Sequence, residues 1–581
     1  MKSSYKSQLL LFVIVVFAFG LRIVAISNVP PGLNRDEASL GYTAYSILKT
    51  GRDEYGVLFP LSLKSFGDWK LPVYSYVAIP FISIFGLTET AVRFPSALFG
   101  TLTVLLTYLL VKKLIDRLDV ALLAAAILAI SPWHIFFSRV SSEANLAVCM
   151  ISLGLWLLLV KSTQKFLQIL GVFIISLTLL TYHGNHVFTP LFFGATIWYI
   201  RKDFSRGTQW ILVGVFVLIS LFVFGVTLRT ADSTKLSGLL IINDISLIHV
   251  NIDKNRQIFT QKTLGKLLNN KAVFLAEQVA FNYIRTFSPE FLAIQGGTNL
   301  QHNIPDFGNL YLIELPFLLL GLFYLFLHKE KSARFLLWWI LISPLGASLT
   351  KDAPHSARSV SMLPAIQIVI AYGMVNSLQI FHRLWQRRIF ISVLILVYAV
   401  SFSIFLGRYF VTFPFKRFSS WGFPYKEMSE KLARLKNNYV KVIVSRPDYS
   451  PYIYYAFYNK SAPQNVQQQL IRYPATVEGF EHVREFDGIA YEKLNWTDEL
   501  LIPNRLYVDW AESVPSGATQ SAILITPDEI MKLATHGELA KSVEIGDIVT
   551  SRIVDTIRLP DSSPLLYFIE TRISTSAAKR Y

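Results

Sequence analysis

Residues 9–20 read LLLFVIVVFAFG, and this uninterrupted apolar stretch decides the class of protein. Similar blocks recur along the chain: TLTVLLTYLLV at 101–111, ALLAAAILAI at 121–130, ILVGVFVLISLFVFG at 211–225 and ISVLILVYAVSFSIFLG at 391–407. A helix needs about 20 apolar residues to cross a bilayer. Of the 581 residues, 52% are hydrophobic and only 16% are charged, whereas soluble proteins carry about 25% charged residues. The sequence therefore predicts a polytopic α-helical membrane protein.

The apolar blocks predict about eleven transmembrane helices within residues 1–410. Segment 71–85 is also apolar, but it is short and contains Pro72 and Pro80, so we interpret it as a juxtamembrane or re-entrant piece. The first block contains Arg22 and lacks a small-residue cleavage site, so it is not expected to be a cleaved signal peptide. The expected spans are 9–26, 91–111, 120–137, 144–160, 166–181, 187–200, 211–228, 310–327, 335–349, 360–377 and 389–410.

Lysines and arginines gather in the short loops on one side of these spans. They occur around residues 112–117, 161–165, 201–206, 329–334 and 383–388, while the opposite short loops hold few. Because positive loops stay in the cytoplasm, the N-terminus is expected to be cytoplasmic. Much of the net charge of +16 then reflects topology and attraction to lipid headgroups. No nucleic-acid partner is predicted.

Two long loops, 27–90 and 229–309, and the tail 411–581 then lie outside the cytoplasm. The tail has a soluble composition, with strand-like runs such as VKVIVS at 440–445 and RLYVDW at 505–510, and a helical run at 425–436. We predict a C-terminal soluble α/β domain on the outer side.

The first outer loop opens with PPGLNRDEASLGY, residues 30–42, which places two acids beside the expected membrane edge. Asn34 and Glu37 have the spacing of a helix capping box, and Gly51 is a plausible helix end. Asp36 would lie in the first helical turn, where the positive end of the helix favours its ionised form. Asp36 is therefore a candidate proton acceptor, and Glu37 is better explained by capping than by substrate binding.

Two further outer segments carry charged groups close to apolar ones. In FGDWKLPVYSY, Asp68 and Lys70 precede the short apolar piece, and Lys70 is either a membrane-edge anchor or a contact for a lipid phosphate. In DAPHSAR, Arg358 stands at the outer start of the tenth span, where an arginine needs a partner or reaches for the headgroups.

Three more side chains are weighed as substrate-binding groups. Arg139 in RVSSEANL forms either a structural ion pair or a substrate contact. His183 and His186 in YHGNHVF are spaced to share one helix face and can line a cleft, while no further Cys or His lies nearby to complete a zinc site. No metal ligand set is assigned.

The order of these motifs resembles the dolichyl-phosphate-mannose protein mannosyltransferase-like glycosyltransferases, which include the aminoarabinose transferases. The resemblance rests on LRIVAISNVPPGLNRDEA, FGDWKLPVY, RFPSA, SPWH and DAPHSARSVSMLP and covers residues 8–410. It implies a GT-C type fold, like that of glycosyltransferase family 39, in a bacterial plasma membrane. It also implies Asp36 as catalytic base, Lys70 as a carrier-phosphate contact and Arg358 as a second one.

The resemblance implies transfer of a sugar, with inversion, from a polyprenyl-phosphate carrier to an acceptor at the outer face: a protein, a lipid or a cell-envelope glycan. A lysine and an arginine can stabilise the departing phosphate, so a divalent metal is compatible with this chemistry but not required. Two other functions stay open on the residues alone. A transporter or flippase would show matching halves with broken helices, which are not visible here, and a noncatalytic envelope scaffold would use the tail as a binding module.

Overall fold

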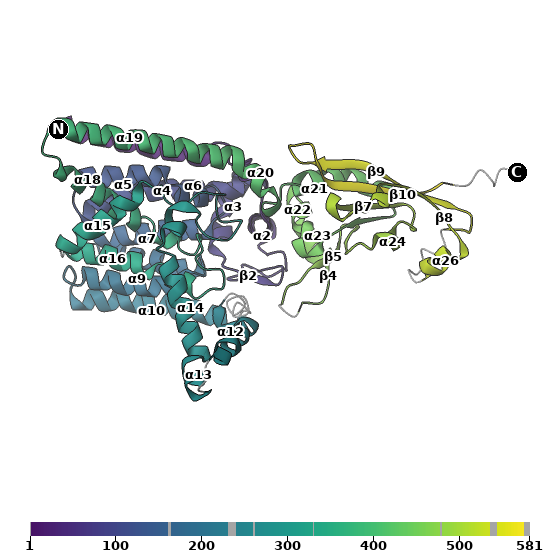
Figure 1. Cartoon of the computed structure of the whole chain (residues 1–581), viewed down its shortest axis with the longest axis horizontal. Helices are drawn as coiled ribbons and strands as arrows, with labels where there is room; N and C mark the ends of the chain where they lie inside the picture. The colour runs from purple at the N-terminus through teal and green to yellow at the C-terminus, as the bar shows by residue number, and fades with distance from the viewer. Residues whose placement is uncertain are drawn as a thin grey trace.

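The protein is described by a computed structural model that covers residues 2–160, 164–229, 240–258, 262–328, 330–476, 479–534 and 543–574. Figure 1 shows a bundle of helices at one end and a β-sheet with short helices at the other. The longest helices of the bundle run roughly parallel to the long axis of the molecule, with the sheet beyond their ends.

Every predicted span overlaps a helix of the bundle. Among the described residues, four helices are long and apolar enough to cross a membrane, and a fifth span results if α5 and α6, bent by 59°, are counted as one. The other apolar helices are shorter. The bundle consists of α1 (Lys2–Ile23), α4 (Glu89–Leu114), α5 (Leu118–Ile130), α6 (Pro132–Ser138), α7 (Glu143–Leu159), α8 (Lys165–Leu177), α9 (Asn185–Ile200), α10 (Arg206–Arg229), α15 (Glu314–His328), α16 (Lys331–Ile342), α17 (Leu345–Ser348), α18 (Ala365–Ser377) and α19 (Leu384–Leu406).

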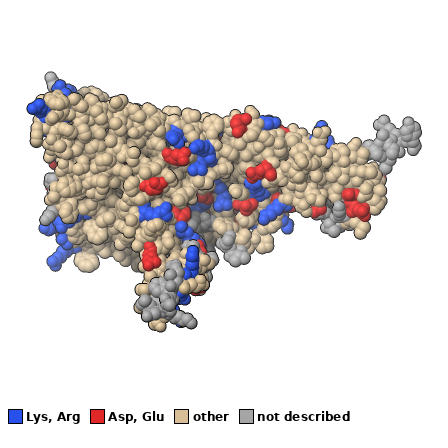
Figure 2. All heavy atoms as spheres, in the orientation of Figure 1, with Lys and Arg blue, Asp and Glu red and all other residues tan. Residues whose placement is uncertain are grey.

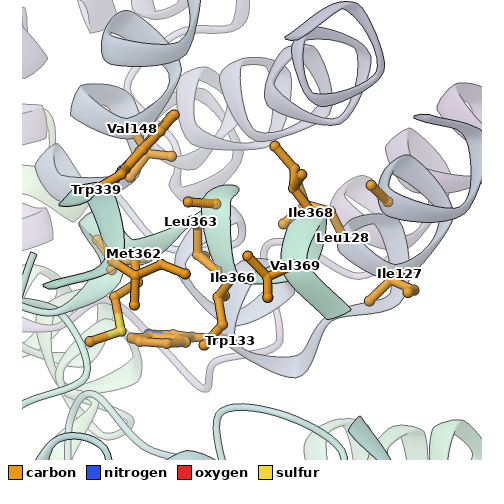
Figure 3. Close-up of a cluster of buried hydrophobic side chains, with 14 of the residues drawn as sticks. Ile127, Leu128, Trp133, Val148, Trp339, Met362, Leu363, Ile366, Ile368 and Val369 are labelled. Atoms are coloured by element: carbon orange, nitrogen blue, oxygen red, sulfur yellow. The ribbon is translucent and has the colours of Figure 1, made fainter. Parts of the chain in front are cut away.

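The bundle packs around a core of aliphatic and aromatic side chains, part of which Figure 3 shows, with Trp133 and Trp339 among them. Helices α15 and α18 approach backbone to backbone, because a Cβ on Gly373 would lie only 3.0 Å from Gly321 Cα. Small residues at such crossings are typical of membrane bundles, where close contact replaces the hydrophobic effect. Helices α1 and α19 lie side by side (Figure 1), with Phe17 and Phe402 in edge-to-face contact at 6.2 Å.

Figure 2 shows how charge is distributed on one face of the molecule. Lys and Arg gather at the end of the bundle that lies furthest from the sheet, and a broad band next to that end carries almost no charged residues. Charges of both signs reappear where the bundle meets the β-rich part. A wide uncharged band with a basic rim is typical of a protein that spans a bilayer.

The first long loop is largely ordered. It forms α2 (Arg35–Thr50), a hairpin of β1 (Leu63–Ser65) and β2 (Asp68–Lys70), and α3 (Val73–Phe85), which is the predicted juxtamembrane piece with Pro80 inside it. The described part of the second loop contains α12 (Ile245–Ile258), α13 (Lys262–Leu268), α14 (Lys271–Arg285) and the π-helical turn Glu290–Ile294, followed by irregular chain.

The C-terminal part contains an eight-stranded mixed sheet in the order β4-β5-β6-β3-β7-β10-β9-β8. Strand β3 is parallel to β6 and β7, and every other pair is antiparallel. Its elements are α21 (Tyr425–Leu435), β3 (Lys441–Val444), α22 (Pro451–Tyr458), α23 (Pro463–Gln469), β4 (Ile471–Arg472), β5 (Val483–Phe486), β6 (Ile489–Tyr491), α24 (Trp496–Glu499), β7 (Arg505–Trp510), α25 (Ser516–Thr519), β8 (Gln520–Leu524), α26 (Pro527–Ala534), β9 (Ile548–Arg558) and β10 (Pro564–Ser574).

The sheet region shares a hydrophobic core with the first loop. Side chains of α2, α3 and α4 pack in the same buried cluster as those of α21 and α22. A Cβ on Gly41 would lie 2.5 Å from Val92 Cγ2 and 2.9 Å from Phe457 Cε2, so glycine lets α2 lie tightly between α4 and α22. The Tyr42 hydroxyl also donates to the carbonyl of Ser461 at 2.8 Å. Helix α2 is therefore held on both sides.

A buried carboxyl group at this junction predicts a pH effect on stability. Burial raises the pKa of Glu54 from 4.5 to about 7, although the positive charges of Arg472 and Lys70 oppose the shift. Between about pH 4.5 and 7 the unfolded chain loses this proton while the folded chain keeps it, so stability should fall as pH rises through that window. Glu54→Gln should make stability depend less on pH, which is measured as the melting temperature between pH 5 and pH 8. An unchanged slope would contradict the assignment, and Glu427→Gln, at an exposed site on α21, is the control.

Candidate functional site

The first turn of α2 has the predicted capping box. The Asn34 side chain accepts from the Glu37 amide at 2.9 Å, and Glu37 Oε2 accepts from the Asn34 amide at 3.2 Å. The helix ends as expected at Gly51, which is left-handed with φ 69°. Asp36 is the second residue of the helix, and its side chain is 58% exposed. The sequence thus correctly located the helix start that presents Asp36.

Two buried arginines fix the turn that leads into this helix. Arg93 donates to the carbonyls of Ile26 and Pro30 at 2.8 and 3.1 Å, and it holds Glu37 through two nitrogens at 3.0 and 2.8 Å. Arg139 donates to the carbonyls of Leu21 and Val29 at 2.7 and 3.2 Å. Since both guanidinium groups are fully buried, they anchor the chain just before Asp36.

A cavity of about 280 Å³, which we call cavity A, opens beside Asp36. It lies between the first turns of α2 and α7, the end of α6, the start of α9 and the loops before α15 and α18. Three predicted residues besides Asp36 line it: Lys70, His183 and Arg358. Its other lining residues include Asn34, Ser141, Ser142, Glu143, Tyr182, Asn299, His302, His355 and Trp421.

Two positively charged side chains line cavity A together with Asp36. Lys70 Nζ lies 2.9 Å from Asp36 Oδ1, and the lysine side chain is only 5% exposed. The ammonium also lies 5.1 Å from the centre of the Phe66 ring, where a cation is favoured. Arg358, which is 15% exposed, donates to Thr350 Oγ1 at 2.8 Å and pairs with Asp352. Cavity A is thus lined by the Asp36 carboxylate, by Lys70 in contact with it, and by Arg358, and both cations are of the kind that bind phosphate.

Two histidines that the sequence analysis did not select complete this wall. The rings of His302 and His355 lie 4.9 Å apart, and His302 stacks on Phe137. Burial and the nearby Arg358 lower the pKa of His302 to about 4, and burial lowers the pKa of His355 as well. Both rings are therefore neutral near pH 7 and can each donate one hydrogen bond. His355 belongs to the quoted DAPHSAR motif, whereas the surroundings of His302 gave no signal.

Asp36 also borders a second cavity of about 500 Å³, which we call cavity B. Asn34 and Asp36 line both cavities. Most of the remaining wall of cavity B comes from the C-terminal part of the chain: Ser419, Ser420, Gly422, Tyr425, Asp448, Tyr449 and Tyr454, together with Arg35 and Gln301. The sequence analysis did not connect this region to Asp36.

The structure does not bring three of the predicted substrate-binding residues to cavity A. Glu37 is 1% exposed, and its carboxylate serves Arg93, the Ser141 amide and the helix cap. Arg139 donates to two main-chain carbonyls rather than to the carboxylate of the expected ion pair. His186 bonds the carbonyl of Leu179 at 2.8 Å. In this geometry each of these residues is engaged by the protein itself, and their substrate-binding role stays a prediction.

Two further expectations concern Asp68 and a metal. Asp68 begins strand β2, but its side chain lies outside the described part of the structure. His183 and His186 have ring centres 5.5 Å apart, and His183 Nε2 lies 3.4 Å from the carbonyl of Trp69. In the described part of the chain no group of three or more His, Cys, Asp or Glu side chains is arranged to hold a metal ion.

Comparison with known proteins gives one family match. The model of the family described as dolichyl-phosphate-mannose-protein mannosyltransferase matches residues 70–226, which include Lys70, Arg139 and both predicted histidines. No curated protein matches the chain.

Among solved structures, the chain is similar to the archaeal oligosaccharyltransferase AglB from Archaeoglobus fulgidus in complex with an inhibitory peptide and a dolichol-phosphate. The TM-score is 0.50 at 14% identity, over 78% of this chain and 64% of that one, so this chain spans about 64% of the length of the archaeal enzyme. ArnT from Cupriavidus metallidurans in the apo state aligns over 98% of both chains at 10% identity, with a TM-score of 0.48. The chain as a whole is similar in fold to the archaeal enzyme. The resemblance expected from the sequence is confirmed by the family model, which matches residues 70–226.

Proposed function

We propose that the protein is an inverting membrane glycosyltransferase that moves a sugar from a polyprenyl-phosphate carrier to an acceptor at the outer face of the membrane. The observation that carries this proposal is the convergence of Asp36, Lys70 and Arg358 on cavity A. The match of residues 70–226 to a family that uses a lipid-phosphate-linked sugar supports it. So does the dolichol-phosphate bound by the archaeal enzyme of similar fold.

The chemistry needs one proton acceptor and one site for a developing negative charge. An acceptor hydroxyl oxygen attacks the anomeric carbon, while the bond from that carbon to the phosphate oxygen breaks. The hydroxyl proton passes to the Asp36 carboxylate, and the bond electrons leave with the polyprenyl phosphate, which gains one negative charge. Lys70 and Arg358 face the cavity where that charge would form and can stabilise it without a metal.

The ion pair of Asp36 and Lys70 suits this sequence of events. Before the donor binds, the lysine is paired with the carboxylate at 2.9 Å. A donor phosphate competes for the same ammonium group, so its arrival frees Asp36 to accept the proton of the acceptor hydroxyl. Donor binding would thereby prepare the base.

The position of the basic loops relative to cavity A indicates how the protein is oriented in the membrane. Cavity A lies at the end of α1 away from the N-terminus, and the basic loops, with Lys112 and Lys113, lie at the opposite ends of the helices. If the basic loops are cytoplasmic, Asp36 and the C-terminal sheet are extracytoplasmic, in a bacterial plasma membrane with the N-terminus inside.

The direct test supplies membranes that contain the full chain with a radiolabelled polyprenyl-phospho-sugar. A transferase moves label from the extractable lipid to another molecule and releases polyprenyl phosphate in equal amount. A flippase changes the side of the label but leaves the sugar on its carrier, and a scaffold does neither. Label that stays entirely on the carrier would reject the proposal.

Lys70→Ala is expected to weaken binding of the sugar donor more than it slows the transfer step. A hydrogen bond to a charged group contributes about 1.5–3 kcal/mol, so KM for the labelled donor should rise about 10- to 100-fold. Polyprenyl phosphate should also compete less well as an inhibitor. Lys351→Ala is the control, because that lysine lies in an outer loop and pairs with Asp244 away from cavity A. An unchanged donor KM in Lys70→Ala would remove Lys70 from the phosphate site.

A further inference from the structure

We infer that cavity B binds the acceptor and that the acceptor is a neutral carbohydrate, held by Asp448 and Tyr449 from the C-terminal part of the chain. This inference rests on the proposed function, because it names the partner that receives the sugar. It assigns the C-terminal sheet region a direct part in substrate selection.

The position of Asp36 is the first support. Asp36 lines both cavity A and cavity B, so a group in either cavity can approach it. Cavity A carries Lys70 and Arg358, the two cations suited to the donor phosphate. An acceptor hydroxyl must reach the same carboxylate from elsewhere, and cavity B is the other opening beside it.

The charge of cavity B argues against a phosphate there. Its wall contains the carboxyl groups Asp36 and Asp448 and one cation, Arg35. Arg35 donates to the main-chain carbonyl of Asp448 at 3.3 Å and stacks over the Phe66 ring at 4.9 Å. Once a donor phosphate draws Lys70 away from Asp36, the wall carries two carboxylates against one guanidinium group, which disfavours an anionic acceptor.

The polar surface of cavity B matches a molecule rich in hydroxyl groups. Among the described lining residues there is no aliphatic side chain, so the apolar pockets that usually anchor peptide side chains are missing. The wall instead offers hydroxyl, amide and carboxylate groups beside tyrosine rings, with Tyr425 and Tyr454 stacked at 4.3 Å. Sugar rings present hydroxyl groups at their edges and C–H groups on their faces, which suit such polar and aromatic partners.

The turn that carries Asp448 and Tyr449 has a strained backbone. The residues on either side of the short helical turn Pro447–Tyr449, Arg446 and Ser450, both have φ of 55°, which only glycine adopts without cost. Backbone strain of this kind occurs at sites where the chain must present side chains to a ligand. Here it presents the exposed Asp448 and Tyr449 side chains to cavity B, and Tyr449 is 49% exposed.

Photo-crosslinking identifies the occupant directly. The photoreactive amino acid p-benzoyl-phenylalanine replaces Tyr449 in the full chain, which is expressed in its own cells and irradiated, and the adduct is analysed by mass spectrometry. The expected adduct shows a series of sugar masses and is destroyed by periodate. A peptide adduct, a phospholipid adduct or no adduct would overturn the inference. The same amino acid at Met531, which is 73% exposed on α26, is the control and should give no glycan adduct.

Kinetics separate this inference from the proposed function. Tyr449→Ala and Asp448→Asn should each lower transfer to an isolated envelope fraction about tenfold at limiting acceptor, while the donor KM changes less than twofold. Asp528→Asn, an exposed acid on α26, is the matched control. If Asp36→Asn abolishes transfer but both cavity B variants behave like the control, the inference fails alone. If Asp36→Asn transfers normally, the proposed function fails.

Discussion

Asp36→Asn is expected to lower the rate of sugar transfer by about 10²- to 10⁴-fold, the usual contribution of a positioned general base. The amide cannot take the proton of the acceptor hydroxyl, and it removes the negative charge next to Lys70 Nζ. Because the side chain is 58% exposed and the helix cap uses Asn34 and Glu37 instead, the fold of α2 should survive. The loss should therefore fall on kcat, with the donor KM little changed or lowered.

The measurement is the initial rate of label transfer from a polyprenyl-phospho-sugar in membranes with matched amounts of protein. Asp116→Asn is the control, since that carboxylate is 84% exposed in the loop between α4 and α5 and pairs with Lys112 in the last turn of α4. Transfer at the control rate by Asp36→Asn would exclude this residue as the base.

Local features of the fold could be predicted from the sequence because they depend on neighbouring residues. Each apolar block that was predicted to span the membrane overlaps a helix of the bundle. Asn34 and Glu37 marked the start of α2, and Gly51 marked its end. Helix ends in the bundle were less accurate, because bends such as the 59° angle between α5 and α6 depend on packing. The sharing of one core by α2 and α22 could not be predicted, since it joins distant parts of the chain.

The candidate site could be predicted only in part, because some of its residues belong to sequence motifs and others do not. Asp36, Lys70 and Arg358 followed from motif order, and the structure places all three on one cavity. For Arg139 the sequence left a structural and a substrate-binding role open, and the structure shows it bonded to main-chain carbonyls, a partner that residue type and position alone do not reveal. Asp448 carried no signal, because only the docking of the C-terminal part on α2 brings it beside Asp36.

Glu37→Ala is expected to destabilise the protein far more than it changes the chemistry of transfer. Arg93, fully buried, would lose the carboxylate that it holds through two nitrogens, and the Ser141 amide would lose its acceptor. Removing one partner of a buried ion pair costs about 3–5 kcal/mol. The altered chain should therefore unfold at a much lower temperature in detergent, followed by the loss of the monodisperse peak in size-exclusion chromatography.

A comparison of variants separates this anchoring role from a direct role in the reaction. Glu37→Gln keeps an oxygen acceptor for Arg93 and should lose less stability than Glu37→Ala. Glu427→Ala, which removes an exposed carboxylate paired with Lys431 one helical turn away, should cost at most about 0.5 kcal/mol. Below its unfolding temperature Glu37→Gln should still transfer sugar, because Asp36 remains the base. If a Glu37 variant had normal thermal stability but transferred no sugar, Glu37 would take part in the reaction. Its role as the partner of Arg93 would then not be the reason that an acid follows Asp36.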